Sequence, residues 1–275
     1  MVWAAFPVSA VLVAAGSFSQ TAHAQTIVPH RAAYTATLAP AYAGGQIGSV
    51  SGDMLFEWLD VCEGWTLSQT YQLSLSFAGG SSAALTSRYT TFESYDGQRF
   101  TFDAQDTRNG VAESESRGDA TLDASPGPGV AQMRLPAPQE MALPDETWFP
   151  TAHSVEILRR AADGERIFSA LMFDGSATLP LTLITTVIGQ PRAPAAGGDE
   201  APVSDAQPGD AVLRAGTSWP VVLAYFDPAS QDAEPIYEVR FTLYDTGFID
   251  AMTVDYGDFG ITLSAVAAEA LPTNC

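Results

Sequence analysis

The two cysteines could form a disulfide bond, which is the clearest covalent chemistry that this sequence offers. Cys62 and Cys275 are the only cysteines, and the second is the last residue of the chain. If they pair, the bond closes a loop over most of the chain and stabilises the fold by about 5 kcal/mol as an upper value. Such a bond persists only in an oxidising compartment. Two unrelated buried thiols are the alternative, and the spacing leaves both open.

A nucleophilic serine is not supported by the one stretch that resembles a catalytic motif. The nucleophile elbow requires a serine at the centre of Gly-x-Ser-x-Gly, because small neighbours permit its sharp turn. The stretch from Gly48 to Gly52 has Val50 at this centre and serines on either side. We therefore interpret it as a strand that follows a glycine-rich turn.

Histidine chemistry is restricted to two positions, His30 and His153, once the predicted leader is removed. A zinc site on a helix needs a second histidine one turn away, and His153 has only Glu156 near it in sequence. His30 precedes Arg31 at the start of the first predicted strand. We expect both histidines to make structural hydrogen bonds, and we predict no metal, no cofactor and no catalytic residue.

Acidic residues gather at two places where calcium binding has to be considered. The two groups are Asp103, Asp106 and Asn109, and Asp245, Asp250, Asp255 and Asp258. Oxygen ligands suit calcium, but these groups lack the order of acids around a glycine that defines an EF-hand. They fall at predicted strand ends, where Asp and Asn commonly form turns. Carboxylate pairs for glycoside hydrolysis could be hidden among so many acids, but spacing alone cannot identify them.

Aromatic residues recur through the first half of the chain. They are Phe56, Trp58, Trp65, Tyr71, Phe77, Tyr89, Phe92, Phe100 and Phe102. Packing in a hydrophobic core is the default interpretation. The alternative is an apolar groove inside a curved sheet, which could receive an acyl chain or an apolar peptide.

Composition narrows the classes of partner. There are 32 acidic residues against 12 basic ones, all of them arginine, and the net charge is -20. This charge disfavours nucleic acid and anionic membrane surfaces. Residues 1–24 fit an export signal, with an apolar run at Val11 to Ala15 and the cleavage pattern Ala22-His23-Ala24. Later segments are too short and too polar for a membrane helix, so we expect an exported chain without stable membrane insertion.

Alternation of apolar and polar residues predicts the elements that position these side chains. Residues 67–77 alternate strictly, so Leu67, Tyr71 and Leu75 share one face of a half-buried antiparallel strand. Turn signals at Asp96-Gly97 and Asn109-Gly110 predict two hairpins. Further strands are predicted at 165–173, 180–189, 217–226, 236–246, 248–256 and 259–267. We expect one β domain over residues 25–275, with a flexible loop at about 190–210 that is rich in Pro, Ala and Gly.

One amphipathic helix interrupts the strands. Thr151, after Pro150, is the predicted N-terminal cap, and Gly164 is predicted to end the helix. The predicted apolar stripe consists of Val155, Leu158 and Ala162. A single helix among many strands favours a helix that packs against, or plugs, a curved sheet.

Six short segments, in this order, carry a resemblance to a known family. They are His30-Arg31-Ala32-Ala33-Tyr34, Cys62-Glu63-Gly64-Trp65-Thr66, Phe149-Pro150-Thr151-Ala152-His153, the stretch from Tyr237 to Gly247, Asp255-Tyr256-Gly257-Asp258-Phe259 and Leu271-Pro272-Thr273-Asn274-Cys275. Together they resemble the EipB family of periplasmic cell envelope integrity proteins over nearly the whole chain after residue 30.

The resemblance implies a mainly β fold, a large antiparallel β-spiral or partly opened barrel with one helix packed in it, similar to the LolA and LolB lipoprotein carriers. It also implies a disulfide between Cys62 and Cys275. It implies a non-enzymatic periplasmic protein that supports the envelope under stress. Candidate partners are envelope proteins and a lipid or lipoprotein ligand. The alternatives are a scaffold that binds envelope proteins by strand addition, and a hydrolase of envelope polymers.

Overall fold

The computed structural model describes residues 27–194 and 208–273. The predicted export signal at residues 1–24 lies outside the described residues. The strands are β1 (His30–Leu38), β2 (Ile47–Asp60), β3 (Gly64–Phe77), β4 (Ser82–Ser94), β5 (Arg99–Arg108), β6 (Val111–Leu122), β7 (Gly127–Leu135), β8 (Gln139–Trp148), β9 (Ile167–Phe173), β10 (Leu181–Ile188), β11 (Ser218–Phe226), β12 (Tyr237–Tyr244), β13 (Ile249–Asp255) and β14 (Gly260–Ala270). The helices are η1 (Pro40–Tyr42), α1 (Pro150–Asp163) and α2 (Pro208–Leu213).

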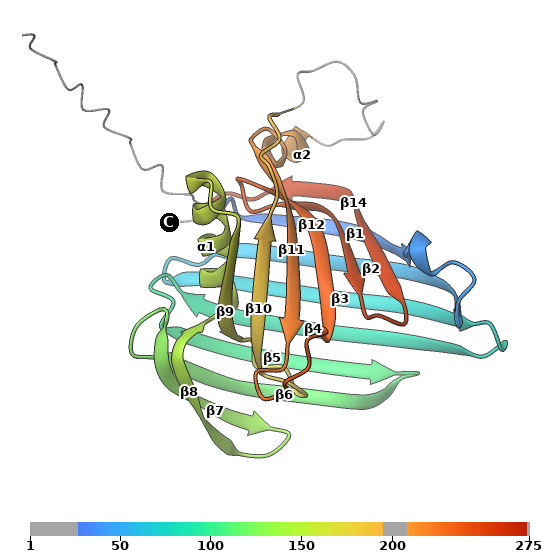
Figure 1. Ribbon diagram of the computed structural model, residues 1–275, viewed down its shortest axis with the longest axis horizontal. Helices are drawn as coiled ribbons and strands as arrows, with labels where there is room; N and C mark the ends of the chain where they lie inside the picture. Colours follow the sequence, from blue (N-terminus) through green and yellow to red (C-terminus); the bar gives the residue numbers. More distant parts are fainter. Residues whose placement is uncertain (1–26, 195–207, 274–275) are drawn as a thin grey trace, which may run out of the picture.

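The strands form one closed ring in which each strand is hydrogen-bonded to its neighbours in sequence, and β14 closes the ring against β1. In Figure 1, β9 to β12 cross in front of β3 to β6 at a steep angle. The barrel is therefore flattened, and side chains from its two walls meet in one core. Phe56 and Leu67 of the rear wall, for example, belong to the same hydrophobic cluster as Leu223 of the front wall.

The mainly β class is thus confirmed, with one difference from the partly opened barrel that we expected. The ring closes, but only narrowly, between β8 and β9. These two strands run parallel and pair only at Thr147 with Leu171 and at Trp148 with Met172. The other neighbouring strands are antiparallel. We call this short pairing the β8–β9 seam.

Both hairpins predicted from their turn residues are present. The β4–β5 turn contains Gly97 with a φ of +65°. The β5–β6 turn has Asn109 and Gly110 with φ values of +53° and +76°. Positive φ at two central residues is typical of the turn whose twist matches paired strands, and Asn-Gly adopts it at low cost. The six later strands also form at the predicted positions.

Helix α1 is present and ends at Gly164 as predicted, but two details of the prediction were wrong. Its N-terminal cap is Phe149, with no side-chain cap, and Thr151 already lies inside the helix. The buried face contains Ile157, Leu158 and Ala161, whereas Ala162 is exposed. Leu158 of the predicted stripe is buried and Val155 packs against the same cluster, so the error is confined to Ala162.

The predicted loop at 190–210 falls largely on residues 195–207, which lie outside the described residues. The two ends of the predicted loop contain secondary structure that we did not expect. Arg192 forms a bridge with Ser218, and α2 begins at Pro208. Helix α2 was not predicted. It brings the buried Leu213 into the cluster around Phe248.

Candidate functional site

The first candidate site is a cavity of about 280 Å³ inside the barrel, beside α1, which we call the helix cavity. Its lining comes from α1 and from both walls. It consists of Met54, Phe56, Trp58, Leu67, Gln69, Tyr89, Pro150, Thr151, His153, Ser154, Ile157, Leu158, Met172, Asp174, Leu223, Tyr225, Val239, Phe241, Leu243, Gly247, Ile249 and Met252. Most of these side chains are apolar, and none is an arginine, so the cavity suits an apolar occupant.

A second interior cavity, of about 630 Å³, lies next to the first, and we call it the tyrosine cavity. Tyr71 and Tyr256 line it together with apolar residues such as Leu75 and with polar residues that include Asp106 and Glu113. The two cavities are neighbours because Gln69, in the wall of the helix cavity, donates a hydrogen bond to the Tyr71 hydroxyl. The interior of the barrel is thus only partly filled by side chains.

His153 is fully buried in the wall of the helix cavity, and burial lowers the pKa of its imidazole to about 4. The ring is therefore neutral near pH 7. It packs against Phe168 at 5.6 Å between ring centroids. Its Nε2 has no partner among the described residues, so this nitrogen does not make the predicted structural hydrogen bond. A buried nitrogen without a partner carries an energetic cost.

Trp58 presents a similar unsatisfied group in the same cavity. Its side chain packs edge-on against Phe56 and Trp65. Its Nε1 is buried and has no hydrogen-bond partner in the described part of the chain. A buried indole N–H normally finds an acceptor. The helix cavity therefore contains an unused donor at Trp58 and an unused nitrogen at His153.

Two buried carboxyl groups lie close to α1, and sequence analysis did not identify either. Glu93 of β4 accepts hydrogen bonds of 2.7 Å from the backbone N–H groups of Thr151 and Ala152. It therefore supplies the cap that α1 lacks locally. Burial raises the pKa of Glu93 to about 7 and that of Asp174 to about 6. The only early signal for Glu93 was that it is the single acid of its strand.

His30 and Tyr34 of β1 have structural contacts. His30 is buried, and its Nδ1 lies 2.7 Å from the Val28 carbonyl oxygen, which confirms the hydrogen bond expected for it. Burial lowers the pKa of this ring. The hydroxyl of Tyr34 donates to the Ile249 carbonyl at 2.6 Å. These hydrogen bonds join β1 to Val28, just before it in sequence, and to Ile249 of β13.

The remaining residues of the resemblance lie at turns and close approaches. Gly64 packs directly against the β4 backbone, where a Cβ would collide. Pro150 is the first residue of α1. Asp255 accepts from the Tyr42 hydroxyl and from the N–H of Gly257, whose φ is +82°. The structure brings His153 and Pro150 to the helix cavity, and it places Asp255 and Gly257 away from it, at the β13–β14 turn.

The acids considered for calcium are engaged with protein groups. Asp250 pairs with Arg214, Asp255 pairs with Arg240, and Asp245 accepts from the N–H of Thr217. Within the described ranges, no three His, Cys, Asp or Glu side chains are grouped closely enough to hold a metal ion. In the same ranges, no helix has the length and hydropathy to cross a membrane.

The strand register bears on the predicted disulfide. His30 stands opposite Trp58 of β2 on one side and Ala270 of β14 on the other. Strands β2 and β14 therefore run in the same direction and end at the same end of the barrel. Cys62 follows β2 in the turn before β3, with a φ of +67°. Cys275 lies outside the described residues, so the pairing stays a prediction.

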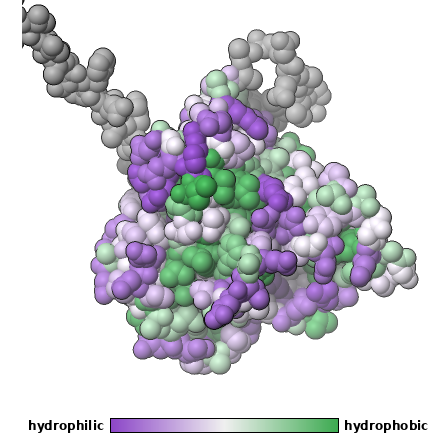
Figure 2. Space-filling model, viewed as in Figure 1, coloured by the Kyte–Doolittle hydropathy of each residue, from purple (hydrophilic) through white to green (hydrophobic). Residues whose placement is uncertain are grey.

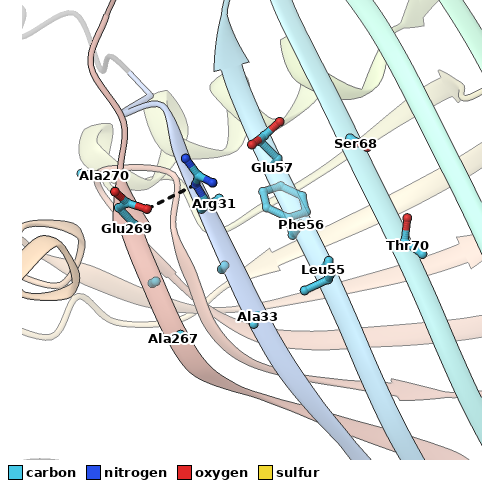
Figure 3. A pocket seen from close by; sticks show the side chains of 12 residues that line it. Arg31, Ala33, Leu55, Phe56, Glu57, Ser68, Thr70, Ala267, Glu269 and Ala270 are labelled. Atoms are coloured by element: carbon cyan, nitrogen blue, oxygen red, sulfur yellow. Dashed lines mark ion pairs between the residues drawn. The ribbon is translucent and has the colours of Figure 1, made fainter. Parts of the chain in front are cut away.

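A hollow larger than either interior cavity lies on the outer wall of the barrel. It measures about 880 Å³ and crosses β14, β1, β2 and β3 (Figure 3). Arg31 and Glu269 form an exposed ion pair of 3.3 Å across its floor, beside Ala33 and Ala267. An exposed pair of this kind contributes little to stability. This hollow has no buried unsatisfied polar group among its described residues, so the interior is the better candidate site.

The closed ring of strands, the helix at its end and the partly empty interior define the fold as a β-barrel. The chain belongs to the EipB-like family, whose model matches residues 21–272. It is 33% identical over 259 residues to the cell envelope integrity protein EipB of Brucella abortus (strain 2308), covering 93% of this chain and 89% of that protein.

A solved structure shares the architecture. The crystal structure of a beta-barrel-like protein of domain of unknown function DUF1849 from Brucella abortus superposes with a TM-score of 0.77 at 30% identity. The match covers 90% of this chain and 99% of that one. The family resemblance found in the sequence is thereby confirmed. The similarity to the LolA and LolB carriers stays a prediction.

Proposed function

We propose that this protein helps to maintain the cell envelope from the periplasm, without enzymatic activity, by holding an apolar ligand inside its barrel. The observation that carries the proposal is the helix cavity, which is lined mainly by apolar side chains and adjoins the more polar tyrosine cavity. A relative of 33% identity is named a cell envelope integrity protein. The predicted export signal and the predicted disulfide support the periplasmic location.

The charge of the protein agrees with ligand holding and disfavours two other roles, the binding of nucleic acid and the binding of an anionic membrane surface. A net charge of -20 repels nucleic acid and anionic membrane surfaces. The two carboxyl groups near the helix cavity, Glu93 and Asp174, have oxygens that accept backbone N–H bonds. These contacts give both carboxylates a positioning role. The geometry thus supports binding better than catalysis.

The test is a cavity-filling variant in cells that lack the native protein. Val239→Phe adds bulk at the wall of the helix cavity, and Val266→Phe adds the same bulk on the exposed side of β14. We expect both variants to fold, which thermal melts verify. Val266→Phe should restore growth under detergent stress, whereas Val239→Phe should not restore it. Full rescue by a folded Val239→Phe protein would contradict ligand holding as the function.

A scaffold that binds envelope proteins is the second candidate, and the outer surface of the barrel favours it. The edge of β8 that faces β9 is paired only at Thr147 and Trp148. Apolar surface is visible over the nearby front wall in Figure 2, where Ile167 and Val187 are exposed. Yet Pro144 and a charged Glu146 with a φ of +64° interrupt the β8 edge, which hinders strand addition. Crosslinking in intact cells separates the candidates, because a scaffold traps proteins and a carrier traps lipid.

A further inference from the structure

The helix cavity contains a polar feature that the proposed function does not explain. In a mainly apolar lining that also contains Gln69 and Asp174, Trp58 Nε1 and His153 Nε2 are both buried and unpartnered among the described residues. Trp58 is 5% exposed and His153 is 2% exposed. Native proteins pair the great majority of buried polar atoms, so two orphans in the wall of one cavity call for a common explanation.

The chemistry of these two groups restricts what can satisfy them. An indole N–H is only a donor, and a neutral imidazole offers one donor and one acceptor. A carbonyl oxygen accepts from one or both, and a hydroxyl group can also donate to the imidazole. Both partners are neutral, so they supply no charge to balance an ionised ligand group, and a neutral oxygen can satisfy them without that cost.

The charges around the cavity exclude an anionic head group. The described side chains that line it include no arginine, and the sequence has no lysine. Asp174 lies in the wall and Glu93 lies behind the first turn of α1. A buried carboxylate or phosphate would have no cation to pair with, and it would face these acids at close range.

The size of the helix cavity limits the length of the hydrocarbon chain that a ligand can place inside it. A volume of about 280 Å³ is at the lower end of small-molecule pockets, which measure about 300–1,000 Å³. One short chain fits this space better than a diacyl lipid. A longer chain can continue towards the tyrosine cavity, next to the Gln69–Tyr71 hydrogen bond.

We infer that the helix cavity binds an uncharged, single-chain apolar molecule that carries an ester, amide or alcohol oxygen, and that Trp58 Nε1 and His153 Nε2 hydrogen-bond to this oxygen. The inference rests on the proposed function, because it specifies the ligand of the same interior. It assigns both side chains as positioning groups for the polar end of the ligand. The hydrocarbon chain lies against residues such as Leu223 and Val239.

The test uses the full mature protein and displacement of the uncharged fluorescent probe N-phenyl-1-naphthylamine at pH 8. The competitors share a ten-carbon chain and differ in the head group: decanol, methyl decanoate, decanoate and decylamine. We expect decanol and methyl decanoate to displace the probe at concentrations at least tenfold lower than decanoate or decylamine. Equal competition by decanoate, or stronger competition by decylamine, would overturn the inference while leaving ligand holding intact.

Variants test the two anchors. Trp58→Phe and His153→Phe remove the polar atoms and keep an aromatic ring, and we expect each to weaken decanol binding about 3- to 10-fold with little change in probe affinity. Thr186→Val removes a buried unpartnered hydroxyl that does not line the cavity, and it should leave decanol binding unchanged. Unchanged decanol binding in both anchor variants would overturn the assignment.

A measurement on the unmodified protein covers the case in which a variant does not fold. The indole N–H resonance of Trp58 should move downfield in a ¹H–¹⁵N spectrum when decanol is added, because it gains an acceptor. An unmoved resonance at saturation would contradict the anchor. Failure of the uncharged probe to bind at all would instead overturn the proposed function, and the inference with it.

Discussion

At the scale of single residues, Glu93 is the most informative side chain. It joins β4 to the first turn of α1 through two backbone N–H groups, and it is buried while doing so. Burial disfavours its charged form, whereas the two hydrogen bonds favour it. The raised pKa of about 7 indicates that burial is the stronger effect. The helix start is therefore linked to pH in the neutral range.

This linkage predicts the sign of a pH dependence. The folded protein holds the Glu93 proton more tightly than the unfolded chain, in which its pKa is 4.5. The Glu93 contribution to the free energy of unfolding therefore falls as pH rises from about 4.5 to about 7, by about 3 kcal/mol at most. Asp174 acts in the same direction up to about pH 6. His153 acts in the opposite direction between about pH 4 and 6.5.

Urea unfolding between pH 5 and pH 8 separates these effects. We expect Glu93→Gln to remove the Glu93 share of the change in stability with pH, so that the variant loses less stability than the wild type between pH 5 and pH 7. Glu140→Gln, at an exposed position of β8, should keep the wild-type slope. An identical slope in Glu93→Gln would show that Glu93 titrates in the same range in both states.

Buried threonines allow a matched comparison of satisfied and unsatisfied hydroxyl groups. Thr186 and Thr147 are both fully buried, but Thr186 Oγ1 has no partner among the described residues, whereas Thr147 Oγ1 donates to Pro144 at 2.7 Å. Removing an unsatisfied hydroxyl relieves a desolvation cost. We expect Thr186→Val to raise the free energy of unfolding by about 1 kcal/mol and Thr147→Val to lower it by a similar amount. Denaturant titrations check this, and destabilisation by Thr186→Val would be the contrary result.

At the scale of elements, α1 closes one end of the core through Ile157, Leu158 and Ala161. We expect Ile157→Ala to cost about 2–4 kcal/mol, because it leaves a cavity beside the strands. Ala162→Ser, on the exposed side of the same helix, should change stability by less than about 0.5 kcal/mol. Equal costs at the two positions in unfolding experiments would mean that the helix does not pack through the face described.

The β8–β9 seam is the weakest part of the ring, since only two residue pairs join these strands. On its other edge β9 pairs with β10 from Ile167 to Phe173. Amide hydrogen exchange should therefore be faster for the seam positions Thr147 and Trp148 than for the β9–β10 ladder. Equal protection on both edges of β9 would show that the ring opens elsewhere.

The strands were predictable because alternation and turn residues are local signals. The Asn109-Gly110 turn and the alternating face of Leu67, Tyr71 and Leu75 follow from neighbouring residues alone. The cap by Glu93 was not predictable, because it joins residues that are far apart in sequence. Helix α2 was missed because it is short and its buried contact, Leu213, is made to distant strands. The cavities depend on how two walls face each other, which no local pattern encodes.

At the scale of the whole molecule, the predicted Cys62–Cys275 bond would join the turn after β2 to the end of the chain. The register supports it, because β2 and β14 end at the same end of the barrel on either side of β1. The bond would stabilise the fold by at most about 5 kcal/mol. In a chain of this size we therefore expect reductant to lower the midpoint of thermal unfolding by about 10 °C. The folded-state circular dichroism should not change. An unaltered midpoint, with both thiols open to alkylation in protein taken from the periplasm, would contradict the bond.

The central claim is that the flattened barrel encloses an apolar ligand beside α1. Native mass spectrometry of protein purified gently from the periplasm tests it most directly. We predict an added mass that organic solvent removes, that extraction identifies as an uncharged single-chain lipid, and that Val239→Phe protein lacks. Protein that is consistently empty, and that also fails to take up an apolar probe, would contradict the account.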